Sequence, residues 1–309
     1  MQRDLLDRQP FVFHHKLLGH PALSLENLGR MIPALPQWQV HYSSGKLQRS
    51  DDFGRAHETH ANGLSIEETI ETIRTSDSYI MIREPDVDAS FHPLYRELIH
   101  DVQGVMRDCG AGREAHDAKL YLFISSPNSV TPFHIDRYSN FLMQIQGSKE
   151  VSVFPQWDAR SVPCSVRESV VAYSGERATW HPGAEQLKTT YKVFPGDALH
   201  IPFVAGHHVR NGPEVSITLS LFFHTSRTRS LTRAMHLNDQ LRRRLGWRPH
   251  PIGMAPVRDA VKSGVWLLGR TVARRVDTGV VVVTPANLDS PEVQELLNPP
   301  LDKYLQPGE

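Results

Sequence analysis

Cysteine is scarce in this chain of 309 residues: only Cys109 and Cys164 occur, and their spacing fits neither a CxxC pair nor a disulfide framework. A disulfide-stabilised secreted scaffold is therefore excluded, and a reducing compartment is expected. No run of about 18 apolar residues is present, and the N-terminal stretch MQRDLLDRQPFVFHHK lacks the apolar core of a signal peptide. We expect a cytoplasmic protein without a membrane partner.

An excess of charge of one sign is also lacking. The 34 Lys and Arg residues balance 34 Asp and Glu residues, so the overall charge gives no reason to expect a nucleic-acid partner. The distribution is uneven, because residues 226–275 carry eleven Arg and one Lys against two Asp. This basic segment is either a solvated helical face or a docking surface for an acidic partner.

The middle of the chain, residues 116–225, has the texture of a β domain. Short segments rich in β-branched and aromatic residues are separated by turn residues at the intervals found in sandwiches and barrels. We expect strands at 119–125, 131–136, 140–147, 149–155, 189–194, 198–203, 207–212 and 214–223. This region is the predicted catalytic core.

The flanking regions have helical patterns. Residues 1–115 form a mixed α/β region in which a capping box, Ser65 with Glu68, begins a helix over 66–75, and a second helix covers 93–107. Residues 226–309 are predicted to be mostly helical, with a leucine stripe ending near Gly246, a helix over 257–275 and a short helix opened by Ser290-Pro291. The stripe either packs on its own core or forms a homodimer; its residues are Leu237, Leu241 and Leu245.

A histidine and an aspartate suggest a metal site. His134 and Asp136 are separated by one residue, so in a strand their side chains project from the same face. A third ligand must come from another segment, and His207 or His208 can supply it. Two imidazoles and one carboxylate on one side of an iron leave open positions for a bidentate co-substrate and O2, whereas structural zinc prefers a closed tetrahedral set. The pattern therefore favours Fe(II).

Two segments, HIDRYSNFLMQIQGSKEVSVFP and PGDALHIPFVAGHHV, together resemble the JmjC/cupin family of Fe(II)- and 2-oxoglutarate-dependent oxygenases. The resemblance is closest to the asparaginyl hydroxylase that is the factor inhibiting hypoxia-inducible factor, and to its bacterial relatives. It covers roughly residues 119–224 and implies a mainly β protein with a double-stranded β-helix (jelly-roll or cupin) core and α-helical additions at both ends. The residues that match the family motif are Thr131, His134, Asp136, Asn140, Lys149 and His207.

The resemblance implies roles for these residues. His134, Asp136 and His207 would bind the metal, because the family ligand follows the Ile-Pro dipeptide by five residues, and His208 would then point outward. Lys149 would pair with the distal carboxylate of 2-oxoglutarate, and Thr131 would donate its hydroxyl to the same group.

Three further positions are less constrained. Asn140 would either contact 2-oxoglutarate or orient the triad, and Tyr79 would be a third ligand to the distal carboxylate, with Tyr121 as the alternative. His200 is expected to be a hydrogen-bonded core histidine. Ser220 stands where the family has an asparagine, so the resemblance is incomplete there.

The implied function is a 2-oxoglutarate-dependent dioxygenase that uses Fe(II) and O2 to hydroxylate an unactivated C–H bond on a protein or peptide side chain. The alternatives are a tailoring hydroxylase for a small metabolite, which a deep narrow pocket would favour, and a non-catalytic cupin that only binds a metal or ligand. No catalytic residue beyond the metal ligands is predicted.

Overall fold

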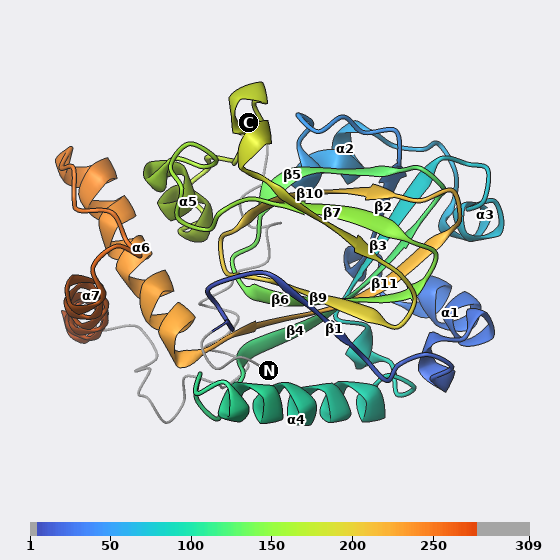
Figure 1. The fold of residues 1–309 in the computed structure, drawn as a ribbon, viewed down its shortest axis with the longest axis horizontal. Helices are drawn as coiled ribbons and strands as arrows, with labels where there is room; N and C mark the ends of the chain where they lie inside the picture. Colours follow the sequence, from blue (N-terminus) through green and yellow to red (C-terminus); the bar gives the residue numbers. More distant parts are fainter. Residues whose placement is uncertain (1–4, 277–309) are drawn as a thin grey trace.

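The computed structural model describes residues 5–276, whose strands form two antiparallel sheets that pack face to face (Figure 1). The seven-stranded sheet has the order β1-β9-β6-β11-β4-β3-β2, and the four-stranded sheet has the order β5-β10-β7-β8. The strands are β1 (Phe11–His14), β2 (Val40–Ser44), β3 (Ser78–Arg83), β4 (His116–Ser125), β5 (Val130–Ile135), β6 (Ser139–Gln146), β7 (Lys149–Val153), β8 (Thr189–Val193), β9 (Asp197–Ile201), β10 (Gly206–Asn211) and β11 (Ser216–His224).

Helices surround this sandwich on several sides (Figure 1). The α-helices are α1 (Leu25–Met31), α2 (Ala56–Thr59), α3 (Ile66–Glu71), α4 (His92–Asp108), α5 (Cys164–Val171), α6 (Ser226–Leu245) and α7 (Pro256–Val276). Short 3-10 turns occupy Pro21–Leu23, Ile32–Ala34, Gln37–Gln39, Phe53–Arg55, Pro85–Val87 and Pro182–Leu187. Among residues 5–276, no helix combines the length and the apolar character needed to cross a bilayer.

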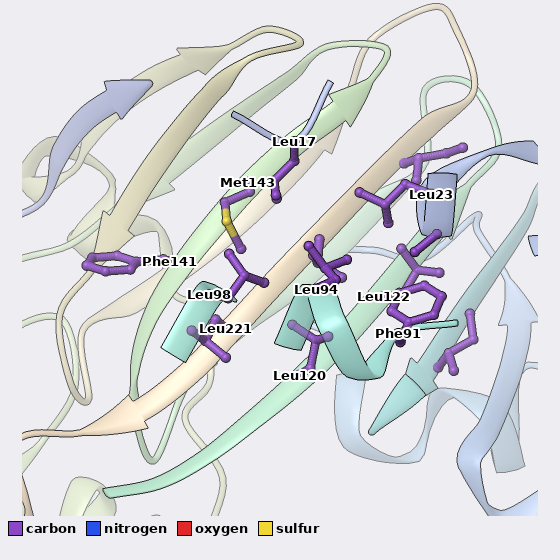
Figure 2. Close-up of a cluster of buried hydrophobic side chains, with 14 of the residues drawn as sticks. Leu17, Leu23, Phe91, Leu94, Leu98, Leu120, Leu122, Phe141, Met143 and Leu221 are labelled. Carbon is purple, nitrogen blue, oxygen red and sulfur yellow. The ribbon is translucent and has the colours of Figure 1, made fainter. Parts of the chain in front are cut away.

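The outer face of the seven-stranded sheet packs on α4. Leu94 and Leu98 from the helix meet Leu120, Leu122 and Leu221 from the sheet, and Figure 2 shows these side chains in one cluster. The helix places Leu94, Leu98 and Val102 on one side because they recur every four residues. This packing covers one face of β4 and leaves its opposite face toward the second sheet.

The space between the two sheets is a second, smaller core. Aliphatic side chains from both sheets meet there: Leu142, Val151, Val153, Val193, Leu199, Ile201, Ala205 and Val209. Because side chains alternate along a strand, every second residue of each of these strands points into this interior. Lys149 lies on the same face as Val151 and Val153, so its side chain enters this interior, opposite the buried Asn211 of β10.

The expected fold class is confirmed: a cupin-type β-sandwich carries helices before and after it. All eight core strands expected from the sequence are present, and α6 ends at Gly246, which adopts φ 64° as a left-handed C-cap. The helix expected over 66–75 is shorter, because α3 ends at Glu71 and turns follow it. The helix expected at Ser290-Pro291 lies outside the described residues.

Candidate metal centre

Strand β5, which carries His134, has an irregularity that determines which of its side chains point into the sandwich. His207 pairs with His134 and Val209 pairs with Thr131, so β10 advances two residues where β5 advances three. The extra residue in β5 is a β-bulge, and Pro132, which lacks a ladder N–H, lies within it. Regular alternation would turn Thr131 away from His134, and the bulge brings both side chains to the same face.

His134, Asp136 and His207 converge, with one potential ligand atom of each lying within 4.8 Å of the others. The Nε2 atom of His134 is 3.8 Å from one carboxylate oxygen of Asp136, and Nε2 of His207 is 3.5 Å from the other. These separations are too long for hydrogen bonds, yet one ion could contact all three groups. Oδ2 of Asp136 is buried without a hydrogen-bond partner in the structure.

Backbone carbonyls determine which imidazole nitrogen is available. Nδ1 of His134 lies 2.8 Å from the carbonyl oxygen of Pro132, and Nδ1 of His207 lies 3.0 Å from that of Ala205. A carbonyl oxygen only accepts, so each Nδ1 donates its hydrogen and the Nε2 lone pair remains available to a metal. Burial lowers the pKa of His134, and the nearby His207 lowers it further, which favours the neutral ligand form.

The aspartate is also oriented by a neighbour. Burial raises the pKa of Asp136, while a hydrogen bond from the Asn140 side chain opposes that shift. The Asn140 amide oxygen remains buried without a partner. Of the two roles expected for Asn140, orientation of the triad is therefore the one with a contact in the structure. The donor set of two neutral imidazoles and one carboxylate on one side fits Fe(II).

His208 does not join the cluster. It follows His207 in β10 and projects to the opposite face, where its ring lies 6.0 Å from the ring of Phe154. His200 is a fully buried core residue, as expected: its Nε2 accepts a hydrogen bond from the backbone N–H of Asp7, and its Nδ1 donates to the carbonyl of Asn140.

Lys149 is buried in the sandwich interior without a counter-ion. Its exposed fraction is 7%, and no described residue forms an ion pair or hydrogen bond with its ammonium. Burial alone lowers the pKa of Lys149 to about 7. A buried ammonium without a partner destabilises the folded chain, so the position is suited to an anionic ligand.

Thr131 and Tyr79 come together beside the triad. Their hydroxyl groups are hydrogen-bonded, both residues are buried, and Asp136 is close enough to raise the pKa of Tyr79 beyond the effect of burial. Tyr121, the alternative, instead packs edge-on against Phe222 at a centroid distance of 5.0 Å and is partly exposed. Ser220 is buried in β11, and its hydroxyl has no partner.

Phe53 is a site residue that the sequence did not reveal. Its ring lies 4.7 Å from the ring of His134 and 5.7 Å from that of Tyr79. It comes from a 3-10 turn between β2 and α2, and the nearby Arg49 carbonyl accepts a hydrogen bond from the Phe133 backbone of β5. No motif marks such a residue, because its place depends on how a loop folds over the sheet.

The sequence matches a known protein family. The model of the cupin-like domain matches residues 25–229, which is most of the sandwich and its N-terminal additions. The chain belongs to the cupin-like domain family. The closer likeness to the asparaginyl hydroxylase stays a prediction from the sequence motifs.

Solved structures of Escherichia coli YcfD are similar to this cupin-like chain. An X-ray structure of YcfD has 15% identity and a TM-score of 0.46, and covers 94% of this chain and 67% of that chain. A crystal structure of ribosomal oxygenase YcfD has 16% identity, a TM-score of 0.44 and coverages of 94% and 66%. YcfD with cobalt and succinic acid has 16% identity, a TM-score of 0.42 and the same coverages. The cupin-like chain thus spans about two thirds of the length of these structures.

Proposed function

We propose that this cupin-like protein is an Fe(II)- and 2-oxoglutarate-dependent oxygenase that hydroxylates an unactivated C–H bond, with a protein or peptide side chain as substrate. The observation that carries the proposal is the buried, unpaired Lys149 in the same interior as the His134, Asp136 and His207 cluster. A cupin that bound a metal alone would have no use for a second, cationic position.

The chemistry of 2-oxoglutarate matches this pair of features. Its 2-keto acid end is a bidentate iron ligand, and its other end is a carboxylate that needs a cation and hydroxyl donors. In the proposal Lys149 binds that carboxylate, and Thr131 and Tyr79 donate their hydroxyl hydrogens to it. Ser220, whose hydroxyl is buried without a partner, is available to donate as well.

The protein's own residues hold and shield the reacting groups. His134, Asp136 and His207 would bind iron through one face, which leaves the opposite positions open. Asn140 holds the carboxylate of Asp136 in place, and the aliphatic interior excludes water. Iron with 2-oxoglutarate and O2 would supply the oxidation: one oxygen atom enters succinate as CO2 leaves, and the other becomes the substrate hydroxyl.

The test is an anaerobic titration of the full chain with Fe(II) and 2-oxoglutarate, followed by admission of O2. We expect the visible charge-transfer absorption of a chelated 2-keto acid, then its loss with formation of succinate. His207→Gln should lose the absorption, and the matched change His208→Gln on the opposite face should keep it. If the wild-type chain binds a metal tightly and shows neither absorption nor succinate, the protein is a binding cupin and the proposal is wrong.

A further inference from the structure

Part of the inner face of the seven-stranded sheet is less covered by the other described residues than the rest of that sheet is. On the inner face of β3 and β4, Tyr79 and Ser125 are buried, but the side chains farther along both strands are partly exposed. We call this surface the platform; it consists of Met81, Arg83, Lys119, Tyr121 and Phe123. Their outer-face neighbours, such as Ile82 and Leu120, are fully buried, so the exposure belongs to the inner face alone.

The platform is connected to the candidate metal centre by ring contacts. On one side Phe123 lies 6.0 Å from Tyr79, which in turn contacts Phe53, the residue that covers His134. On the other side Tyr121 lies 5.0 Å from Phe222, whose ring is 6.4 Å from that of Tyr138. Tyr138 follows Asp136 by two residues in the chain, so this second set of rings adjoins the segment that carries the triad aspartate.

Arg83 has no ionic partner at the far end of the platform. It pairs in register with Tyr121, it is partly buried, and no described residue forms an ion pair with its guanidinium. Lys119 and Arg229 each have an anionic partner: Lys119 lies 3.8 Å from a carboxylate oxygen of Glu84, and Arg229 lies 3.7 Å from one of Asp117. A partly desolvated guanidinium without a partner favours a carboxylate, which it can bind through two parallel hydrogen bonds.

We propose that the substrate is an extended peptide that lies along the platform, and that Arg83 binds the carboxylate of an Asp or Glu in that peptide. This inference rests on the proposed function. Arg83 lies four residues beyond Tyr79 in β3, which is about 13 Å along the strand. The surface from Tyr79 to Arg83 therefore has the length of about four residues of extended peptide, and a small metabolite would cover only part of it.

A peptide also fits the platform better than a nucleic acid does. The Met81, Tyr121 and Phe123 side chains give an apolar surface for the residues between the two ends. Nucleic acids are bound by stripes of many cations, whereas the platform offers one unpaired guanidinium and the whole chain has no net charge.

Binding of two labelled pools of eleven-residue peptides to the full chain, measured by fluorescence anisotropy, tests the proposal. The pools are degenerate and identical except that one contains Glu where the other contains Gln. We expect the Glu pool to bind about fivefold more tightly than the Gln pool. Arg83→Gln should abolish that preference, while Arg83→Lys and the exposed Arg107→Gln should keep it. Arg83→Glu should instead prefer a third pool that contains Lys at the same position. A preference unchanged in Arg83→Gln contradicts the inference.

Turnover separates this inference from the proposed function. A proteolytic peptide library would be incubated with the full chain, Fe(II), 2-oxoglutarate and O2, and hydroxylated peptides would be aligned by mass spectrometry. We expect Asp or Glu to be enriched at one fixed position relative to the oxidised residue, Arg83→Gln to lose the enrichment, and the exposed Arg107→Gln to keep both the enrichment and the succinate formation. Succinate formation without any hydroxylated peptide would overturn the peptide assignment alone. Oxidation of RNA fragments, when these replace the peptide library, would do the same. Absence of succinate from the wild-type chain would overturn the proposed function.

Discussion

The closed interior of the sandwich and the platform contrast in how each holds its cation. Lys149 is almost fully buried between Val151 of its own strand and Asn211 of β10, and burial brings its pKa to about 7. Arg83 is partly exposed and pairs in register with Tyr121. The first environment suits a small anion that fills a fixed space, and the second suits a larger molecule that enters and leaves.

Because their surroundings differ, Lys149 and Arg83 should respond differently to substitution. Removal of the interior cation eliminates a large desolvation penalty and also the charge that would pair with a buried anion. Removal of a cation from the platform affects only a partly solvated contact. The predictions below therefore separate the metal centre, the interior and the platform.

The largest effect is expected from the metal ligands. Asp136→Ala removes the only carboxylate of the triad, so the full chain should lose Fe(II) and its succinate formation should fall by about a thousandfold or more. Metal content and succinate release are the measurements. The exposed Arg107→Gln should retain both, and wild-type succinate formation by Asp136→Ala would refute the triad.

Lys149→Met should weaken 2-oxoglutarate binding about a hundredfold, because the distal carboxylate would be buried without a cation. Titration of the metal-loaded chain with 2-oxoglutarate measures this, and metal binding itself should be unchanged. Lys192→Met provides the matched control, since Lys192 lies on the neighbouring strand β8 with an exposed side chain. Equal weakening in both variants would assign the effect to general charge rather than to the interior position.

The depressed pKa of Lys149 also predicts how stability depends on pH. Between pH 7 and 10.5 the unfolded chain keeps the Lys149 proton that the folded chain has lost, so the free energy of unfolding should rise with pH. Relative to Lys149→Met, the wild-type apoprotein should gain about 2 kcal/mol between about pH 7 and pH 9. Urea denaturation of both proteins at each pH measures the difference, and parallel curves would show that Lys149 is not buried as described.

A smaller effect is expected from the hydroxyl that the β5 bulge turns inward. Thr131→Val preserves the shape of the side chain and removes one donor to the carboxylate, so 2-oxoglutarate affinity should fall about tenfold. Tyr121→Phe on the platform should leave that affinity within about twofold. If the two variants exchanged these effects, Tyr121 rather than the Thr131 and Tyr79 pair would contact the co-substrate.

Local patterns predicted much of the fold but not the features that depend on register. The eight core strands followed from alternating side chains and turn residues, and the spacing of His134 and Asp136 indicated a metal site. The choice of His207 over His208 as the third ligand came from the resemblance to the family motif. The bulge that turns Thr131 toward the same face could not be predicted, because regular alternation places it on the other face.

Contacts between segments that are distant in the sequence explain why other features could not be predicted. Phe53 covers His134 only because residues 45–60 fold back over the inner face of β3, and Asp7 lies in the core only because Ser139 and Thr225 both donate hydrogen bonds to its carboxylate. Part of the basic segment is also internal, since Arg242 forms an ion pair with the buried Glu168 at 2.9 Å. Whether its remaining charges meet a partner, and whether the chain is a homodimer, stay predictions.

Proton uptake on binding tests the central claim most directly. The chain, loaded with Mn(II) so that no oxidation occurs, would be titrated calorimetrically with 2-oxoglutarate at pH 8 in two buffers of different ionisation enthalpy. Because Lys149 with a pKa of about 7 is mostly neutral at that pH, binding of the carboxylate should take up roughly one proton, and Lys149→Met should take up none. Binding of equal affinity without proton uptake in both proteins would contradict the assignment of Lys149 to the co-substrate.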